Sequence, residues 1–172
     1  SEIGQNQKHL VGGFDEEFAD SIAARVIYPD ETHACAFTDR GISFFSSRNQ
    51  AAVELTSQAE PEESIQTVFY SDEYAGFIVR TSGGENPYRM ELYRINGDPV
   101  FTAEFNFQYK HADISGDMVI LYNEEACQIY STSGTLKYSG GLGMEIQQIR
   151  QGRSGSSVIV TGPQVMKEIR LQ

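Results

Sequence analysis

Residues 116–138 read GDMVILYNEEACQIYSTSGTLKY and contain three short apolar runs separated by two polar turns. The runs are Met118–Tyr122, Cys127–Tyr130 and Leu136–Tyr138. Short apolar runs bounded by polar turn residues are typical of β-strands joined by hairpins. We therefore expect three antiparallel strands in this stretch, and most of the remaining chain can be aligned with it.

A copy of this unit lies earlier in the chain. Leu92–Phe101 aligns with Ile129–Tyr138 at a constant offset of 37 positions (129 − 92 = 37). In each copy an apolar pair enters a turn and a second apolar run leaves it, and Gly97 aligns with Gly134 inside that turn. Such a turn needs a residue with positive φ, which glycine adopts without a Cβ clash. The alignment predicts the same hairpin twice.

A second alignment extends the repeat toward the N-terminus. Val26–Glu31 matches Val68–Glu73 at an offset of 42 (68 − 26 = 42), and each segment ends a strand and opens an acidic turn. Four copies of a four-stranded unit follow at intervals near 40 residues. A small sheet can bury both faces only by stacking against its neighbours, as the blades of a β-propeller do. The predicted fold is therefore all-β, a β-propeller of about four antiparallel four-stranded blades, either complete or part of a larger ring. The predicted blades are residues 23–57, 65–105, 109–140 and 146–171 of a single domain, 1–172.

The two ends of the chain suggest how a ring would close. The fourth copy lacks a fourth strand, whereas His9–Phe14 resembles Lys137–Leu142 at the end of the third copy. We therefore predict a strand at residues 9–14 that completes the last blade and joins the two ends of the ring.

Two segments do not follow the repeat. Phe14, Phe18 and Ile22 recur every four residues behind a run of acidic residues, which predicts a short helix at Asp15–Ala24. Gln58–Ser64 is acidic and contains a proline, which predicts a loop between the first two blades.

Composition excludes one class of partner. The 172 residues include 13 Lys and Arg against 24 Asp and Glu, a net charge of −11, and the basic residues are scattered singly. A nucleic-acid surface draws its affinity from clustered cations, so we exclude nucleic acid as a partner. No apolar run approaches the length of a membrane helix, so membrane attachment would require a segment absent from this chain. Cys35 and Cys127 fall inside predicted strands, and we expect buried free thiols.

The repeats resemble a known group of proteins. The stretch Ala112–Leu142 and the terminal Glu168–Leu171 resemble an uncharacterised β-propeller-like family of Gram-positive bacteria with WD40-like or quinoprotein-like repeats. The chain contains no Trp, so it lacks the Trp-Asp dipeptide of WD repeats in the strict sense. The resemblance implies membrane-anchored relatives with an N-terminal hydrophobic helix and further repeats, and an extracytoplasmic or cell-surface location in a bacterium. It implies no activity and no catalytic residues.

Motifs for catalysis are absent from the sequence. Gly152–Ser156 contains two serines but fails the spacing of a nucleophile elbow, and we interpret it as a turn. His111, Asp113 and Asp117 form the best local group for a metal, because alternation sends His111 and Asp113 to the same side of one strand. Aspartate is also a common turn residue, and we favour that role for Asp117. We therefore predict no catalytic residues, no metal and no cofactor.

Binding candidates come from one loop and one aromatic group. Ser82–Pro87 is the longest loop between a predicted second and third strand, and loops on a rigid scaffold commonly carry function. The aromatic residues that follow it either line a recognition surface or pack in the core, and we favour packing because aromatics dominate the cores of stacked sheets. The candidate binding residues are Asn86, Tyr88, Phe107, Tyr109 and His111.

These observations predict a non-enzymatic binding or assembly module whose protein or small-molecule partner the sequence does not identify. The alternative is a propeller hydrolase or lyase that acts on a carbohydrate or lactone at an axial site, which rests on fold analogy alone. A spacer domain without a ligand is a third interpretation. For assembly there are two alternatives, a monomer that forms the ring alone and a homodimer that completes one larger ring.

Overall fold

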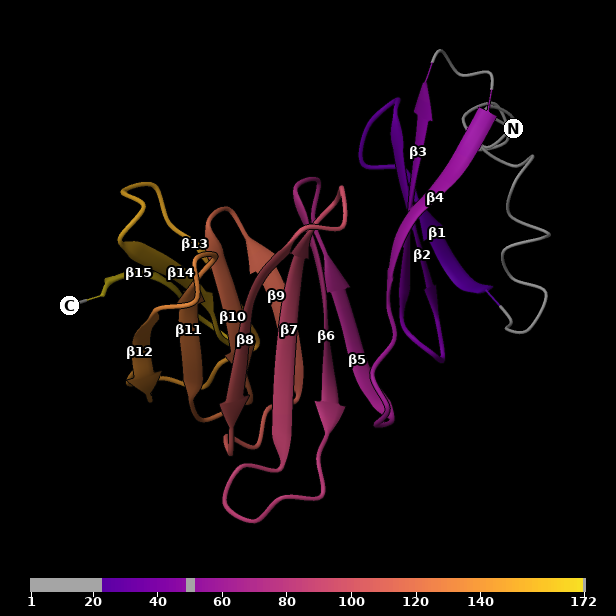
Figure 1. The fold of residues 1–172 in the computed structure, drawn as a ribbon. Coiled ribbons are helices and arrows are strands. Elements are labelled where there is room, and N and C mark those ends of the chain that lie inside the picture. Colours follow the sequence, from indigo (N-terminus) through magenta and orange to yellow (C-terminus); the bar gives the residue numbers. More distant parts are fainter. Residues whose placement is uncertain (1–22, 49–51, 172) are drawn as a thin grey trace.

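The computed structural model describes residues 23–48 and 52–171, which form β-strands joined by turns (Figure 1). The first sheet contains β1 (Ala23–Ile27), β2 (His33–Thr38), β3 (Ile42–Arg48) and β4 (Ala52–Ala59). The second contains β5 (Ile65–Tyr70), β6 (Tyr74–Arg80), β7 (Tyr88–Arg94) and β8 (Pro99–Phe105). The third contains β9 (His111–Ser115), β10 (Met118–Tyr122), β11 (Cys127–Ser131) and β12 (Leu136–Gly140). The fourth contains β13 (Gln148–Gln151), β14 (Ser157–Thr161) and β15 (Met166–Arg170).

Every sheet is an antiparallel meander in which neighbours in sequence are neighbours in space. Three of the described sheets have four strands, and the fourth has the order β13-β14-β15. The all-β fold of about four propeller-type blades, predicted from the repeats, is confirmed. Among the described residues no helix is long and apolar enough to cross a membrane.

The second strands of the first three sheets are buried along most of their length, whereas β14 in the last sheet is only partly buried. All five residues of β10 are buried, and so are the first six residues of β6. A strand buried on both faces must be apolar at consecutive positions, which explains the unbroken run Val119–Leu121. The two cysteines, Cys35 in β2 and Cys127 in β11, are buried and free, as predicted.

Apolar clusters fill the spaces between successive sheets. One cluster joins the first two sheets through Phe44 and Phe77, the next joins the second and third through Leu92 and Val119, and a third joins the third and fourth through Ile129. Within the described ranges no apolar cluster joins the first sheet to the fourth. The sheets fan out as an open arc with the first and fourth at opposite ends (Figure 1), so the described residues do not form a closed four-bladed ring.

The predicted hairpin repeat is confirmed down to the strand register. The pairing of β7 with β8 has a bulge between Leu92 and Tyr93, and the pairing of β11 with β12 has one between Ile129 and Tyr130, 37 positions later (129 − 92 = 37). Such bulges insert one extra residue and increase the local twist. The two hairpins therefore share their irregularities as well as their apolar pattern.

Four predicted boundaries are wrong. Gln58 and Ala59 belong to β4, because they pair with Ser43 and Ile42, whereas we expected a loop from Gln58. Tyr109 precedes β9, because its N–H donates to the carbonyl of Phe107 at 2.9 Å and bends the chain there.

The remaining differences lie at the starts of the fourth and first sheets. Ile146 precedes β13, and its N–H donates to the carbonyl of Glu124 at 2.9 Å while its side chain is buried between the third and fourth sheets. Ala23 and Ala24 belong to β1 rather than to the end of a helix. The rest of the helix predicted at 15–24, and the strand predicted at 9–14, lie outside the described residues.

Candidate interaction surface

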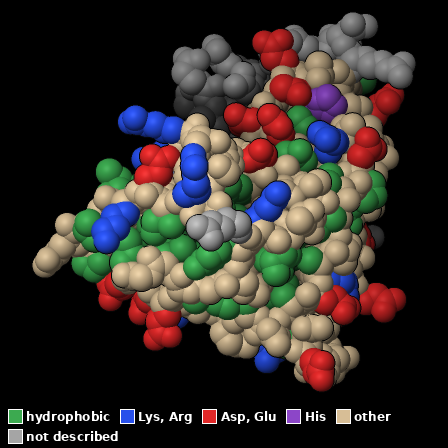
Figure 2. All heavy atoms as spheres, turned by 90° about the vertical axis from the view of Figure 1, so that its left-hand side faces the viewer, with side chains coloured by type: hydrophobic (Ala, Val, Ile, Leu, Met, Phe, Trp, Pro, Cys, Tyr) green, Lys and Arg blue, Asp and Glu red, His purple; other side chains and the backbone are tan. Residues whose placement is uncertain are grey.

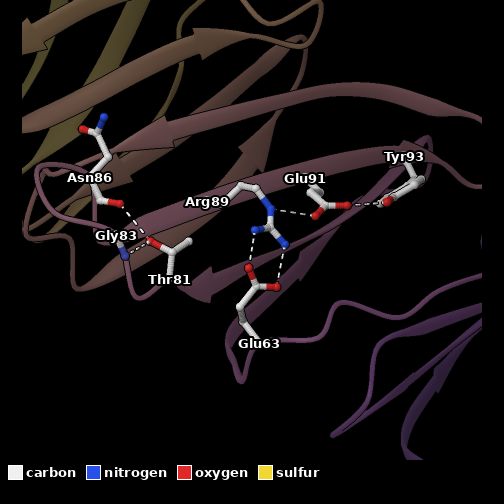
Figure 3. Close-up of polar contacts among 7 residues, drawn as sticks. All are labelled: Glu63, Thr81, Gly83, Asn86, Arg89, Glu91 and Tyr93. Carbon is white, nitrogen blue, oxygen red and sulfur yellow. Dashed lines mark hydrogen bonds and ion pairs between the residues drawn. The ribbon is translucent and has the colours of Figure 1, made fainter.

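The loop Ser82–Pro87 joins β6 to β7 and projects beyond the sheets at the lower end of the molecule in Figure 1. Thr81 fixes its base: the Thr81 N–H donates to the carbonyl of Pro87 at 2.8 Å, and the Thr81 hydroxyl donates to the carbonyl of Asn86 at 2.9 Å (Figure 3). The residues from Ser82 to Asn86 are exposed. Because the base of the loop is fixed, little conformational entropy is lost when a partner binds its exposed side chains.

A shallow cavity of about 340 Å³ lies beside this loop. Its carboxylates come from three elements, Glu63 from the linker before β5, Glu85 from the loop and Glu104 from β8. Among the described residues that line it, Arg89 of β7 is the one cation. Three carboxylates against one guanidinium leave the cavity negatively charged, which favours a positively charged partner group.

Arg89 is held from two sides. Its Nη1 and Nη2 lie 2.6 and 2.9 Å from the two carboxylate oxygens of Glu63, and its Nε lies 2.9 Å from Glu91 (Figure 3). The hydroxyl of Tyr93 donates to the other oxygen of Glu91 at 2.5 Å. Arg89, Glu91 and Tyr93 alternate along β7 and so share one face of the second sheet.

This polar chain connects the linker to the packing between the first two sheets. The Tyr93 ring lies 5.7 Å from Phe44 of the first sheet and 6.1 Å from Phe77 of its own sheet, measured between centroids. Hydrogen bonds from Arg89 lower the pKa of Glu63 to about 2, and burial together with the Glu91 carboxylate raises the pKa of Tyr93. Because Arg89 is fully paired, the charges left for a partner at the cavity are the carboxylates of Glu85 and Glu104.

The aromatic candidates lie mainly inside the molecule. Tyr88 is 6% exposed and stacks on Phe105 with centroids 5.3 Å apart, while Tyr109 meets the edge of both rings. The Tyr109 hydroxyl lies 2.7 Å from that of Thr67 on β5, and Phe107 packs against the same apolar cluster. These rings join the second sheet to the third and support the loop from behind.

His111 and Asn86 are exposed, but at different places. Asn86 lies in the loop, and its carbonyl accepts the Thr81 hydrogen bond. His111 begins β9, where its ring lies 5.0 Å from the ring of Tyr122. Asn86 and Tyr88 are near each other because they are two positions apart in the sequence. The structure does not gather all five predicted binding residues at one surface.

The three side chains considered for a metal are not brought together. The Asp113 carboxylate accepts a hydrogen bond from Tyr122 at 3.2 Å, and Asp117 accepts one from Gln151 of the fourth sheet at 2.5 Å. His111 and Asp117 lie at opposite ends of the β9–β10 hairpin. Within the described ranges no group of three or more His, Cys, Asp or Glu side chains is arranged to hold a metal ion.

The Arg89 chain was not predicted from the sequence. The alternation of Arg89, Glu91 and Tyr93 is visible in the sequence and could have indicated a polar stripe on one strand. Glu63 gives no such signal, because it lies 26 positions before Arg89 in a segment expected to be a loop (89 − 63 = 26).

Successive small antiparallel sheets stacked around an arc define the chain as a protein of the β-propeller class. Within that class it belongs to the family of unknown function DUF5711, whose model matches residues 1–171. The resemblance to an uncharacterised propeller-like family is thereby confirmed. No curated protein matches the sequence significantly.

Solved structures show the same fold at low sequence identity. BamB from Moraxella catarrhalis superposes with a TM-score of 0.53 at 14% identity, over 87% of this chain and 49% of its own. BBS1N, solved in complex with ARL6DN, gives 0.51 at 12% identity, over 88% and 53%. A variant of Hsv2 from Kluyveromyces lactis with a replaced loop gives 0.50 at 8% identity, over 89% and 50%. This chain therefore spans about half the length of each of these propellers.

Proposed function

We propose that this chain is a non-enzymatic scaffold that binds another protein through the loop Ser82–Pro87 and the acidic cavity beside it. The observation that carries the proposal is the combination of a projecting loop, a base fixed by Thr81 and the unpaired negative charge of the cavity. The loop spans residues 81–87 between β6 and β7, against 39–41, 123–126 and 162–165 at the corresponding places of the other sheets. An enlarged connection on a rigid stack of sheets is a common place for recognition.

The partner surface expected here is basic and rich in hydrogen-bonding groups. Glu85 and Glu104 offer carboxylates, and the loop backbone offers exposed N–H and C=O groups. Lys or Arg side chains of a partner would pair with these carboxylates at the rim of the interface. Ion pairs at an interface rim affect the association rate and the specificity more than the affinity. Protein binding also agrees with the BBS1N structure, in which a propeller of this fold is in complex with ARL6DN.

The described arc is, in our proposal, one part of a larger propeller. Its first and fourth sheets lie at opposite ends, and the propellers with the same fold are about twice as long. A bacterial extracytoplasmic or cell-surface location is part of the same proposal and rests on the sequence resemblance. Fractionation of cells that produce the full-length protein would test the location.

Cross-linking of the purified chain in an extract of its source, followed by mass spectrometry, would identify a partner and the residues that contact it. Binding of the purified partner is then measured to the wild-type chain and to a variant in which Ser82–Pro87 is replaced by Asn-Gly. We expect the variant to lose binding at least tenfold, because the loop supplies most of the contact. The double variant Glu85→Lys/Glu104→Lys should weaken binding in the same direction through charge reversal.

The matched control is Glu124→Gln/Glu125→Gln, which removes two carboxylates from the corresponding turn of the third sheet and leaves the loop unchanged. Binding should be retained in this control. The proposal is wrong if the loop variant binds as the wild type does. It is equally wrong if the chain turns over a carbohydrate or lactone substrate and His111→Ala abolishes that activity.

A further inference from the structure

Two of the linkers between the described sheets place large apolar side chains between the sheets that they join. The linker 106–110 adds Phe107 and Tyr109 to the cluster between the second and third sheets. The linker 141–147 likewise adds three apolar side chains to the cluster between the third and fourth, Leu142, Met144 and Ile146. Such side chains fill the space that two twisted sheets leave between their ends.

The first linker contributes nothing comparable. Residues 60–64 read EPEES, and none of these five described residues belongs to the apolar cluster between the first and second sheets. The linker 106–110, which reads NFQYK, has the same length, so the difference comes from the polar sequence and not from the number of residues. The packing between the first two sheets therefore lacks the linker side chains that contribute to the next cluster.

A cavity of about 510 Å³ lies between the first two sheets, where the turn after β2 approaches the start of β5. Thr38 and Asp39 line it from the first sheet, and residues 64–68 line it from the second. Ile65 and Val68 give the cavity an apolar wall, and Val68 is 37% exposed. Covering this wall with an apolar group from outside would remove apolar surface from water.

Aromatic and cationic contacts hold the two sheets together at the other end of β5. The ring of Tyr70 lies 5.5 Å from that of Phe37 on β2, measured between centroids. The guanidinium of Arg25 on β1 lies 5.7 Å from the centre of the Tyr70 ring and donates to the Tyr70 hydroxyl at 2.6 Å. These contacts fix the first sheet against the second, so the cavity at the start of β5 has a defined shape.

The charges beside the cavity favour a basic partner group. Asp39 belongs to the lining, and Glu62 lies in the linker that borders the cavity. Both are exposed, and neither forms an ion pair with any described residue, whereas Glu60 is paired with Arg40 at 3.6 Å. The complementary ligand therefore combines an apolar group with a positive charge.

We infer that this cavity binds an extended segment of a partner protein in which a large apolar side chain stands next to Lys or Arg. The apolar side chain packs against Ile65 and Val68, and the basic side chain pairs with Asp39 or Glu62. The described lining of the cavity includes no residue of the loop Ser82–Pro87, so the inference does not depend on that loop. The loop-replaced variant should bind this segment as well as the wild type does.

The probe is the peptide Gly-Lys-Phe-Lys-Gly, compared with Gly-Lys-Ala-Lys-Gly and Gly-Glu-Phe-Glu-Gly. We expect the full chain to bind the first peptide about tenfold more tightly than either of the others. The alanine peptide lacks the large apolar group, and the glutamate peptide brings like charge to Asp39 and Glu62. Methyl signals of Ile65 and Val68 in NMR spectra should shift when the first peptide binds, which binding to an acidic surface elsewhere would not cause.

The decisive variant is Val68→Ser, which removes apolar surface from the cavity wall. We expect it to bind the first peptide about fivefold to tenfold more weakly than the wild type. The matched control is Val165→Ser, because Val165 precedes β15 of the fourth sheet and is 44% exposed. Figure 2 shows Lys and Arg side chains beside hydrophobic ones on the side of the molecule that carries this sheet, so a basic peptide should not bind there and the control should bind as the wild type does.

A second pair of variants tests the cavity by filling it. Ser64 lies in the lining, at the end of the linker. Ser64→Phe adds a ring there, and it should bind the first peptide about tenfold more weakly than Ser64→Ala, which adds none. Thermal melting of all the variants shows whether the sheets are intact.

Several results would overturn the inference. One is that the phenylalanine peptide binds no more tightly than the alanine peptide, and another is that Val68→Ser binds as Val165→Ser does. A third is a set of nuclear Overhauser contacts between the Val68 methyl groups and other residues of the chain that fill the cavity in the absence of peptide. If those contacts appear only as the protein concentration rises, a second copy occupies the cavity, and if they do not depend on concentration, a segment of the same chain occupies it.

Discussion

Gly97 and Gly134 occupy the same place in successive sheets, and each lies against the sheet that precedes it. Their φ angles are 95° and 101°. A Cβ atom on Gly97 would lie 2.1 Å from the hydroxyl of Ser57 in the first sheet, and a Cβ on Gly134 would lie 2.9 Å from Phe101 in the second. Glycine is therefore required twice over, for a turn that few other residues adopt and for the close approach of neighbouring blades.

Substituting alanine for either glycine should reduce stability by more than the strain of a positive φ angle alone would. We expect Gly97→Ala and Gly134→Ala to lower the free energy of unfolding by about 2–3 kcal/mol, from backbone strain and from the contact with the preceding sheet. Gly143 is the matched control, because its φ is 74° and nothing lies within 4 Å of its Cβ position. Gly143→Ala should cost only about 1 kcal/mol. Urea unfolding measures all three, and equal losses would contradict the proposed packing role.

The sequence allowed these two hairpins to be predicted because their signal is local. A bulge, a glycine and two apolar runs lie within ten positions, and the offset of 37 repeats them, so the alignment of Leu92–Phe101 with Ile129–Tyr138 defines the blade. The position of Tyr88 between two sheets could not be read in this way, because the residues that cover it, such as Tyr109, come from a different blade. The open arc likewise depends on the angles between successive sheets, and no single residue in the sequence determines them.

The ion pair of Glu63 and Arg89 should make stability sensitive to acid. Arg89 lowers the pKa of Glu63 from 4.5 to about 2 in the folded chain. A carboxylate with a lowered pKa stabilises the folded state above its ordinary pKa, and that contribution is lost as the pH falls from 4.5 toward 2. We therefore expect the unfolding free energy of Glu63→Gln to depend less steeply on pH than that of the wild type within this window.

The matched control for this measurement is Glu62→Gln, which removes an exposed carboxylate from the same linker. Its stability should follow the wild-type pH dependence. Denaturant unfolding at a series of pH values measures the difference. If Glu63→Gln and Glu62→Gln follow the same curve, the pair with Arg89 does not contribute to stability.

Cys35 and Cys127 should be inert to thiol reagents in the folded protein. Burial raises the pKa of both thiols from 9.0 to about 12, with a further contribution from Asp30 at Cys35. A thiol whose pKa is raised in this way holds almost no thiolate at neutral pH, and both side chains are 0% exposed. We expect labelling only in denaturant, where both thiols react. Ser82→Cys, at an exposed loop position, is the positive control, and rapid labelling of the wild-type chain would show that the sheets open.

The outer face of the fourth sheet should not support a head-to-tail dimer that completes a ring. On β10 of the third sheet, the side chains that face the next sheet are Met118, Ile120 and Tyr122, all buried. At the corresponding positions of β14 stand Ser157, Ile159 and Thr161, so a single large apolar side chain remains. Obligate homodimer interfaces resemble a divided apolar core, and this face does not.

We therefore expect light scattering to give the mass of a single chain, 19.1 kDa, at micromolar concentration. Ile159→Asp, which places a charge at the centre of this face, should leave that mass unchanged. A doubled mass that Ile159→Asp returns to the single-chain value would contradict the prediction and establish the homodimeric ring.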